Sequence, residues 1–317
     1  MTTALVTGIT GQDGSYLAEQ LLDRGVRVVG LYRQLSADNF WRIEHLLDRI
    51  TLHCADLHDP GSLIDIVEEF RPDEVYNLAA QSFVPVSWQQ PLLTAEVTGL
   101  GPVRLLEAIR RVHPSARFYQ ASSSEMFGNS VDCPQNEDTP LAPASPYACA
   151  KVYAHHMVLN YGKVYGLFVV SGILFNHESP RRGLEFVTRK VANGAAKIKL
   201  GLMSHLTLGN LSPRRDWGFA SDYTRAMQAM LRRSPGTYVV ATGVNHSVED
   251  LVRTAFEVVD LDWKEHVVLT DRLHRRNEVV RLRGDASRAR EALGWEPSVD
   301  FAGLVRMMVE AELARLA

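Results

Sequence analysis

The sequence predicts an α/β fold: a doubly wound parallel sheet with a smaller C-terminal part interleaved with it. Short apolar runs rich in β-branched residues alternate with segments of helical apolar spacing over roughly the first 175 residues. Loops rich in arginine and glycine follow, and then one more strand-like run, TYVVAT at 237–242. This alternation is typical of βαβ units, and the late strand indicates that the chain returns to the sheet.

The elements follow in order along the chain. We expect strands at ALVTG, VRVVGLY, EVYNLAA, ARFYQAS and LFVVSGILF. Helices are expected at SYLAEQLLDRG, GSLIDIVEEF and GPVRLLEAIRRV, because apolar residues recur there every three or four positions. Asp59 and Ser62 are N-cap candidates for the second of these helices, and Gly25 suits the position after the first. Further amphipathic helices are expected over 247–260 and 300–317, the last packing as core.

The composition is that of a globular protein without a strong overall charge. Of 317 residues, 46% are apolar and 22% charged, and 34 lysines and arginines face 37 aspartates and glutamates. The net charge of −3 provides no field that would attract nucleic acid or an anionic membrane surface, so neither is an expected partner. No run approaches the roughly 18 apolar residues of a membrane-spanning helix, and no secretory leader is expected.

The three cysteines, Cys54, Cys133 and Cys149, are too few and too irregularly spaced for a disulfide framework or a zinc site. We expect them to be packing residues of a protein in a reducing compartment, the cytoplasm. No metal site is expected.

A glycine-rich turn follows the first expected strand. The run TGITGQDG places Gly8, Gly11 and Gly14 between a strand and a helix. Glycines allow the tight turn and the close backbone approach that a pyrophosphate at a helix N-terminus requires. The turn predicts a dinucleotide site, and an ordinary strand-to-helix turn is the alternative.

Arg33 follows the second expected strand, where many dinucleotide-binding folds carry an acidic residue for the ribose. An arginine there suits a 2′-phosphate, so the expected cofactor is NADP, with NAD as the alternative. A solvated loop residue is the other interpretation of Arg33. Asp56 and Leu57 are expected beside the adenine, and 77–82 beside the rest of the cofactor, because ligands of parallel sheets bind at the carboxyl ends of the strands.

Tyr147 and Lys151 stand one helical turn apart in SPYACAK, so both side chains leave the same helix face. A lysine near the phenol is expected to lower the pKa of Tyr147 and let it act as a base near neutral pH. A pair on an exposed helix face is the alternative, but the glycine turn at the start of the chain favours the catalytic interpretation.

The run ASSSEMFG follows the fifth expected strand and supplies a hydroxyl and a carboxylate. The Ser123 hydroxyl is expected to hydrogen-bond the substrate oxygen that Tyr147 deprotonates. Glu125 is the informative residue. A 4-epimerase or a simple reductase needs only hydroxyl, tyrosine and lysine, whereas β-elimination also needs a group that takes the C5 proton and assists departure of the C6 hydroxyl. A helix-capping or surface carboxylate is the alternative interpretation of Glu125.

With these motifs the chain resembles the extended short-chain dehydrogenase/reductases and, among them, the GDP-mannose 4,6-dehydratase family. The resemblance covers nearly the whole chain, through TGITGQDGSYLAEQLL, PDEVYNLAAQS, FYQASSSEMFG, SPYACAK, GILFNHESPRRG, FVTRK, LGNL, RDWGFASDY, SVEDLV and LGWEP in that order. NHESPRRG and LGNLSPRRDWG are the most specific of these motifs. We accordingly expect a Rossmann-type NADP-binding domain over 1–175 and about 213–243, and a nucleotide-sugar-binding domain over about 176–212 and 244–317.

The resemblance implies a hydro-lyase that converts GDP-mannose to GDP-4-dehydro-6-deoxy-mannose by C4 oxidation, elimination of water across C5 and C6, and return of the hydride to C6. By position, the implied catalytic residues are Ser123, Glu125, Tyr147 and Lys151. The expected cofactor contacts are Gly8, Thr10, Gly11, Gln12, Asp13, Gly14, Arg33, Asp56, Leu57, Leu78, Ala79, Ala80, Gln81, Ser82, Tyr147, Lys151, Leu174, Asn176, His177 and Arg182. The expected substrate contacts are Ser82, Ser87, Ser123, Glu125, Asn176, Val187, Lys190, Leu208, Gly209, Arg215, Arg275 and Glu278.

Arginines suit such a ligand because a diphosphate needs planar, bidentate donors. For Arg181, Arg182, Arg214 and Arg215, a hydrophilic loop surface is the alternative.

The chain departs from the family pattern in three places. Ser123 replaces threonine, which keeps the hydroxyl. Gln34 stands where the family commonly has a second arginine, in a loop that joins dimers into tetramers in relatives. The stretch over 258–275 is shorter than in most relatives. We expect a homodimer, with a tetramer as the alternative, because the helices near 95–112 and 146–166 have apolar residues on more than one face. Helices that simply cover the sheet would share this pattern.

Two other functions remain open at this point. A related nucleotide-sugar dehydratase or decarboxylase would share SSSE and SPYACAK but bind another base. A cofactor-sensing regulator would bind NADP without catalysis, although it has no physical need for the complete set of hydroxyl, carboxylate, tyrosine and lysine.

Overall fold

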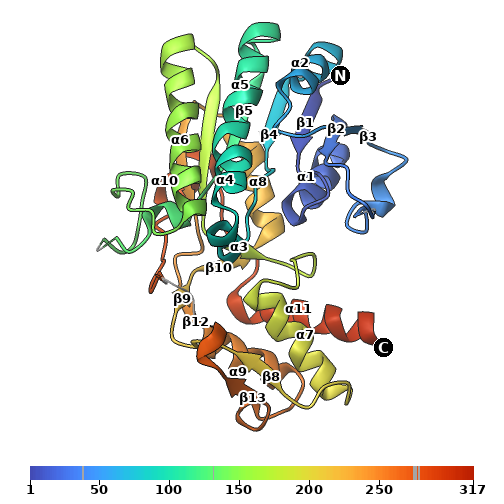
Figure 1. The fold of residues 1–317 in the computed structure, drawn as a ribbon, viewed down its shortest axis with the longest axis vertical. Helices are drawn as coiled ribbons and strands as arrows, with labels where there is room; N and C mark the ends of the chain where they lie inside the picture. The colour runs from blue at the N-terminus through green and yellow to red at the C-terminus, as the bar shows by residue number, and fades with distance from the viewer. Residues whose placement is uncertain (38, 131, 274–276, 278) are drawn as a thin grey trace.

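A parallel sheet forms the centre of the molecule (Figure 1). The computed structural model describes residues 1–37, 39–130, 132–273, 277 and 279–317. Within these residues the sheet has seven strands, and every neighbouring pair is parallel. The strands lie in the order β11 (Gly236–Val240), β6 (Val169–Leu174), β5 (Arg117–Ser123), β4 (Glu74–Asn77), β1 (Thr3–Thr7), β2 (Arg27–Tyr32) and β3 (Thr51–Cys54). The predicted doubly wound sheet is confirmed.

The order of the strands places a crevice at the carboxyl edge of the sheet. β2 and β3 follow one another outward on one side of β1, whereas β4, β5 and β6 follow one another on the other. The loops after β1 and β4 therefore diverge, and ligands of open parallel sheets bind at such a point. β11 pairs with β6 in parallel, which confirms the return of the late strand to the sheet.

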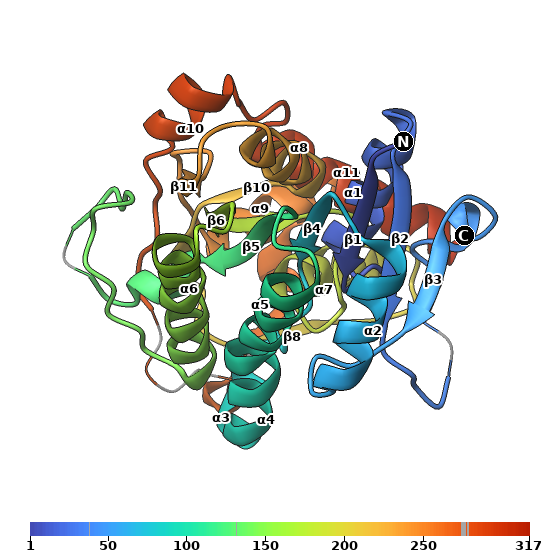
Figure 2. The ribbon, with the colours of Figure 1, turned by 90° about the horizontal axis from the view of Figure 1, so that it is seen from above.

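Helices cover both faces of the sheet (Figure 2). One apolar core lies between the sheet and α1 (Gln12–Asp23), α8 (Ala220–Leu231) and α10 (Ser287–Leu293). A second lies between the opposite face and α2 (Pro60–Phe70), α5 (Gly101–Val112) and α6 (Pro146–Tyr165). The strands contribute apolar side chains to both cores because successive side chains of a strand point to opposite faces.

Local capping fixes where two of these helices begin. The Asp59 carboxylate accepts a hydrogen bond from the Gly61 N–H at 3.0 Å, as expected for the N-cap of α2. Ser62, the other candidate, instead donates to the Asp59 carbonyl oxygen at 3.1 Å. The Ser145 hydroxyl caps α6 by accepting from the Ala148 N–H at 3.1 Å, and this start places Tyr147 in the first helical turn.

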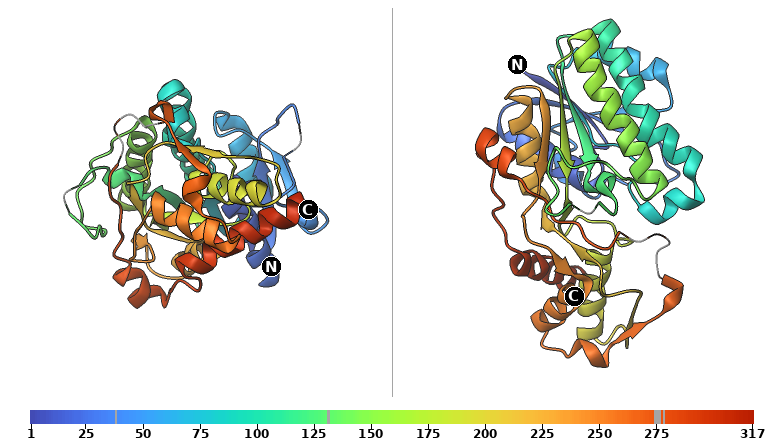
Figure 3. Two further views of the ribbon diagram at one scale, coloured as in Figure 1. Left: turned by 90° about the horizontal axis from the view of Figure 1, so that it is seen from below. Right: turned by 90° about the vertical axis from the view of Figure 1, so that its left-hand side faces the viewer.

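A smaller core lies beyond the carboxyl edge of the sheet (Figure 3). It is formed by α7 (Val187–Lys199), α9 (Val248–Val258) and α11 (Phe301–Leu316), together with the parallel pair β8 (Leu206–Leu208) and β13 (Val267–Leu269). The two helices expected near 247–260 and 300–317 are confirmed as α9 and α11. This smaller lobe faces the ends of the strands and closes the crevice from the other side.

Short elements connect the two parts. β7 (Asn176–Glu178) pairs in parallel with β10 (Trp217–Phe219), and β9 (Arg214–Arg215) pairs antiparallel with β12 (His246–Ser247). α3 (Val84–Gln89) and α4 (Pro91–Thr94) precede a π-helix at Ala95–Leu100, which leads into α5, so the helix expected from 95 begins with a π-helical turn. Single 3-10 turns lie at Glu44–Leu46, Ser124–Phe127, Trp263–Glu265 and Asp271–Leu273.

The prediction that the cysteines are packing residues is wrong. Cys54 and Cys149 are exposed and Cys133 is half-buried, and all three are free thiols. None of the helices that the structure describes is long and apolar enough to cross a membrane. In the same residues, no group of three histidines, cysteines or carboxylates is arranged to hold a metal ion.

Candidate active site

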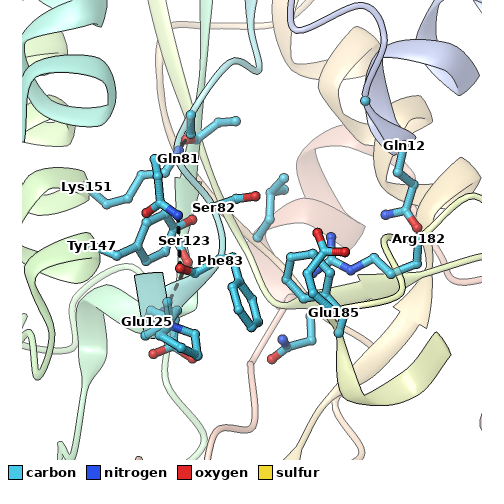
Figure 4. A pocket seen from close by; sticks show the side chains of 18 of the residues that line it. Gln12, Gln81, Ser82, Phe83, Ser123, Glu125, Tyr147, Lys151, Arg182 and Glu185 are labelled. Carbon is cyan, nitrogen blue, oxygen red and sulfur yellow. Dashed lines mark hydrogen bonds between the residues drawn. The ribbon is translucent and has the colours of Figure 1, made fainter. Parts of the chain in front are cut away.

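One large cavity lies between the carboxyl edge of the sheet and the smaller lobe, with a volume of about 1230 Å³ (Figure 4). The turns after the strands line it on one side, and α7, β8 and the neighbouring loops line it on the other. A cavity of this size exceeds a typical small-molecule pocket and has room for two ligands side by side.

Almost every residue that the sequence predicts to contact a ligand lines this cavity. Ser87 does not: it is fully buried in α3, and its hydroxyl donates to the Val84 carbonyl oxygen at 2.6 Å. Arg275 and Glu278 lie outside the residues that the structure describes. The predicted residues that line the cavity are Gly8, Thr10, Gly11, Gln12, Asp13, Gly14, Arg33, Asp56, Leu57, Leu78, Ala79, Ala80, Gln81, Ser82, Ser123, Glu125, Tyr147, Lys151, Leu174, Asn176, His177, Arg182, Val187, Lys190, Leu208, Gly209 and Arg215.

The turn between β1 and α1 requires glycine for two physical reasons. Gly8 has a φ of +70°, a left-handed conformation that other residues adopt at a cost. A Cβ on Gly14 would lie 2.4 Å from the Gly8 carbonyl oxygen, so only glycine lets the first turn of α1 approach the end of β1. These are the demands of a dinucleotide cradle, in which the phosphates meet the free N–H groups of the helix N-terminus. The residues present fit a dinucleotide.

The side chains that begin α1 are engaged with the segment after β6. Gln12 Nε2 donates to the His177 carbonyl oxygen at 3.0 Å, and Ser179 Oγ donates to Gln12 Oε1 at 2.8 Å. Asp13 Oδ2 lies 2.9 Å from His177 Nε2. Burial alone would lower the pKa of His177, but the Asp13 carboxylate outweighs it and raises that pKa. Gln12 and Asp13 thus hold the wall of the cavity with their side chains and leave their backbone N–H groups for a ligand.

The region around the predicted adenine site carries both signs of charge. Arg33 is exposed at the rim of the cavity, after β2. Asp56 Oδ1 accepts from the His58 N–H at 2.9 Å. Burial raises the pKa of Asp56, but the His58 hydrogen bonds and the charge of Arg33 lower it by more. A cation on the rim suits an additional phosphate on the ribose.

The four predicted catalytic side chains come together in the middle of the cavity (Figure 4). β5 ends at Ser123, and the 3-10 turn that follows carries Glu125, whose N–H donates to Ser123 Oγ at 3.2 Å. α6 presents Tyr147 and Lys151 from the neighbouring wall, and both are buried, with 8% and 4% of their surface exposed. A hydroxyl, a carboxylate, a phenol and an amine therefore surround one space.

The electrostatics of Tyr147 differ from the prediction. Burial raises the pKa of the Tyr147 phenol to about 12, with Ser123 and Arg182 opposing the shift and Glu125 adding to it. Lys151 Nζ lies 5.8 Å from the centroid of the Tyr147 ring and donates to the Ala121 carbonyl oxygen at 2.7 Å. Burial lowers the pKa of Lys151 itself to about 8. The predicted lowering of the Tyr147 pKa is therefore wrong for this structure, because burial dominates and the cation that opposes it is Arg182.

A buried network that was not predicted from the sequence lies behind the catalytic side chains. His155 Nδ1 lies 2.8 Å from Ser171 Oγ and 3.3 Å from Ser122 Oγ, and the two hydroxyls lie 2.8 Å apart. The network joins α6 to β5 and β6. One signal was available: His155 lies one helical turn after Lys151 and two turns after Tyr147, on the same face of α6.

The smaller lobe contributes cations and the aromatic ring of Phe186. The Arg182 guanidinium lies over the Phe186 ring at 3.5 Å, and Nε lies 3.0 Å from Glu178 Oε2. Lys190 Nζ donates to the Thr207 carbonyl oxygen at 2.8 Å, and burial lowers the pKa of Lys190. Neither Glu178 nor Phe186 was predicted, although Phe186 stands directly before Val187 in FVTRK.

Comparison with known proteins decides the family. A family model described as GDP-mannose 4,6 dehydratase matches residues 5–308. The chain belongs to the GDP-mannose 4,6-dehydratase family. It is 50% identical to GDP-mannose 4,6 dehydratase 1 of Arabidopsis thaliana over 98% of this chain and 89% of that protein. The corresponding enzyme of Sinorhizobium fredii is 46% identical over 99% and 97%, and that of Homo sapiens 45% over 98% and 91%.

Solved structures share the fold of this GDP-mannose 4,6-dehydratase family member. UDP-glucose 4-epimerase of Thermus thermophilus, in complex with NAD, superposes with a TM-score of 0.87 at 28% identity and covers 98% of this chain and 99% of its own. RMD from Pseudomonas aeruginosa, in complex with NADPH, gives 0.83 at 26% identity over 99% and 100%. Those two proteins bind NAD and NADPH.

Proposed function

We propose that the protein converts GDP-mannose to GDP-4-dehydro-6-deoxy-mannose with a nicotinamide dinucleotide, NADP, as resident cofactor. One observation carries the proposal. A single cavity at the carboxyl edge of the sheet brings Ser123, Glu125, Tyr147 and Lys151 together beside the glycine turn, in a member of the GDP-mannose 4,6-dehydratase family. Of these groups, Glu125 is the one that a simple oxidoreductase has no use for.

The cofactor is held, in this proposal, by the turn between β1 and α1 and by the ends of the neighbouring strands. The N–H groups at the start of α1 bind its pyrophosphate, and Arg33 binds a 2′-phosphate, which favours NADP over NAD. When bound, the cofactor would supply a reversible hydride acceptor that is regenerated within each turnover, so that no external reductant would be consumed.

Tyr147 and Ser123 act on the 4-hydroxyl of the sugar. Ser123 Oγ hydrogen-bonds O4, and the Tyr147 phenolate removes its proton while the hydride leaves C4. A phenol with a pKa of about 12 is protonated at neutral pH, so the phenolate requires nearby positive charge. Arg182 already opposes the rise of that pKa. Lys151, whose Nζ lies 5.8 Å from the centroid of the Tyr147 ring and which is still a cation at neutral pH with a pKa of about 8, is the second source of charge in this proposal.

Glu125 performs the elimination. The C4 ketone acidifies the C5–H bond, and the Glu125 carboxylate takes that proton. The C6–O bond then breaks, the C5=C6 double bond forms, and Glu125 helps the C6 hydroxyl to leave as water. Addition of the hydride to C6, and to C5 of a proton that balances the one Tyr147 took from O4, would complete the 6-deoxy sugar.

The smaller lobe is proposed to bind the nucleotide part of the substrate. Lys190 and Arg215 line that side of the cavity and supply donors for a diphosphate. We further propose the division predicted from the sequence: an NADP-binding domain over 1–175 and about 213–243, and a nucleotide-sugar-binding domain over about 176–212 and 244–317.

The proposed assembly is a homodimer in the cytoplasm. Apolar side chains are exposed together on α3, α4 and α6, where Trp88 is 48%, Leu92 82% and Tyr153 44% exposed. Such a patch is more typical of an interface than of a free surface. The exposed free thiols of Cys54 and Cys149 are compatible with a reducing compartment.

Base specificity tests the proposed substrate. Thermal unfolding of the protein is compared with GDP, UDP, CDP and dTDP, each in the presence of NADP. The proposal predicts that GDP raises the unfolding temperature most. Equal stabilisation by the four nucleotides, or a preference for another one, would overturn the guanine assignment while leaving the catalytic scheme in place.

A further inference from the structure

Three arginines from separate parts of the chain hold one short backbone segment beside the cavity. Arg315 Nη2 donates to the Pro180 carbonyl oxygen at 2.7 Å. Arg42 Nε donates to the Arg181 carbonyl oxygen at 2.7 Å, and Arg189 Nη1 donates to that of Arg182 at 2.6 Å. Arg42 lies after β2, Arg189 in α7 and Arg315 in the last turn of α11. We call these three side chains the arginine clasp.

Trp41 and Glu312 hold the clasp together. The guanidinium carbons of Arg42, Arg315 and Arg189 lie 4.2, 5.4 and 5.5 Å from the centre of the Trp41 ring. Glu312, which is 2% exposed, accepts from both Arg189 and Arg315. The Trp41 ring and the buried Glu312 carboxylate fix the planes of the guanidinium groups, so that each group keeps one orientation.

Arg42 also reaches the glycine turn. Its Nη1 donates to the Thr10 carbonyl oxygen at 3.2 Å, while its Nε binds the Arg181 carbonyl oxygen. One planar side chain thereby joins the dinucleotide cradle to the clasped segment. A lysine in this place could not make both bonds with fixed geometry, because its ammonium is a single point on a flexible stem.

The clasped segment ends at Arg182, whose side chain enters the cavity (Figure 4). The clasp costs free energy, because burial and neighbouring arginine cations lower the pKa of Arg42 to about 10. A cluster of like charges is better tolerated next to an anion. A diphosphate that contacts Arg182 would supply that anion.

We infer that Arg42, Arg189 and Arg315 are positioning residues that hold the Pro180–Arg182 segment so that the Arg182 guanidinium binds the diphosphate of the cofactor. The inference rests on the proposed cofactor role of Arg182. The three arginines do not touch the ligand in this account. Arg189 and Arg315 act only through the segment that they bind, and Arg42 acts through that segment and through the Thr10 carbonyl oxygen of the glycine turn.

Cofactor affinity of the cofactor-free protein tests the clasp. The dissociation constant of NADP is measured by calorimetry for Arg42→Lys and Arg315→Ala, with Arg306→Ala as control. Arg306 lies on α11 too, but it is exposed and only pairs weakly with Glu310, at 3.9 Å. We expect the two clasp variants to bind NADP roughly tenfold more weakly, and the control to bind it as the wild type does. A clasp variant that unfolds at a lower temperature but binds NADP normally would show a structural role only and overturn the inference.

A double variant shows whether Arg315 acts through Arg182. Arg315 reaches the ligand only through the clasped segment, so Arg182→Ala combined with Arg315→Ala should bind NADP no more weakly than Arg182→Ala alone. If the losses of NADP affinity caused by the two single substitutions multiply in the double variant, the inference is contradicted. It is also contradicted if the Arg182→Ala protein binds NADP as the wild type does. If the protein fails to dehydrate GDP-mannose but the clasp variants lose NADP affinity as expected, only the proposed function is contradicted.

Discussion

Tyr147 and Glu125 lie in one cavity, and their surroundings give them different roles. Tyr147 is almost fully buried, and burial raises the pKa of its phenol to about 12. Glu125 is half-buried on a short turn at the end of β5, with room to face a ligand. The phenol is therefore a base only when positive charge is close to it, whereas a carboxylate accepts a proton without such help.

Replacing the carboxylate by an amide tests this division of roles. Glu125→Gln keeps the size of the side chain but cannot take the C5 proton. We expect the rate of dehydration to fall at least about 100-fold, with NADP bound as in the wild type. Product formation from GDP-mannose is followed by mass spectrometry, with Glu310→Gln on the exposed side of α11 as control. Dehydration at the wild-type rate would remove Glu125 from the mechanism.

Lys151 should leave a signature in the stability of the protein at alkaline pH. Burial lowers the folded-state pKa of Lys151 from 10.5 to about 8, so between these pH values the unfolded chain binds more protons than the folded protein. The free energy of unfolding of the wild type should therefore rise, relative to that of Lys151→Met, by roughly 2 kcal/mol from pH 8 to about pH 10. Denaturant unfolding of both proteins across this range measures the difference. Parallel pH profiles would contradict the buried amine.

At the level of elements, α6 owes its position to contacts on both of its sides. Ser145 and Pro146 fix its first turn, and the network of Ser122, His155 and Ser171 joins its middle to β5 and β6. Burial lowers the pKa of His155 to about 4, so its imidazole is neutral at physiological pH and acts as a hydrogen-bonding group. The network therefore sets the distance between the strand that carries Ser123 and the helix that carries Tyr147.

His155→Phe removes the imidazole from this network and leaves only the hydrogen bond between the Ser122 and Ser171 hydroxyls. We expect the free energy of unfolding to fall by about 1–2 kcal/mol and kcat to fall several-fold with KM nearly unchanged, because Tyr147 shifts relative to Ser123. His156→Phe, at an exposed neighbouring position, serves as control. A change in stability without a change in kcat would show that the network has no positioning role.

The strands and long helices could be predicted because their signals are local. Periodicity identified the late strand that became β11, and the residue types at α2 identified its cap at Asp59. Contacts between distant segments leave no such signal. His155, the arginine clasp and the engagement of Gln12 and Asp13 with the segment after β6 depend on partners far along the chain. Ser87 shows the same limit: the family resemblance implied a substrate contact, but the fold turns its hydroxyl toward Val84.

For the whole molecule, the cavity exists only because the smaller lobe closes the carboxyl edge of the sheet. The sheet-bearing part supplies the dinucleotide cradle and the four reacting groups, and the lobe supplies Arg182, Lys190 and Phe186. The Phe186 ring meets that of Phe83, which precedes α3 in the sheet-bearing part, with ring centroids 5.5 Å apart. Reaction and recognition are thus divided between the two parts of the molecule. The helices α3, α4 and α6, which carry the exposed apolar side chains, belong to the sheet-bearing part (Figure 1).

A charge in that apolar patch should separate the proposed dimer. Leu92→Glu places a carboxylate where an apolar side chain is 82% exposed, and burying it in an interface would be costly. Sedimentation velocity should show a dimer for the wild type and a shift to monomer for the variant. Leu202→Glu, 61% exposed in the smaller lobe, should stay dimeric. A wild-type monomer would contradict the proposed assembly.

The central claim is that oxidation at C4, elimination by Glu125 and reduction at C6 occur on one substrate molecule in one cavity. GDP-mannose deuterated at C4 tests it most directly, when it is incubated with the protein without added reductant and the product is analysed by mass spectrometry and NMR. We expect a product that is lighter by one water and carries the deuterium at C6. A product that has lost the deuterium to solvent, or a sugar nucleotide of unchanged mass, would contradict it.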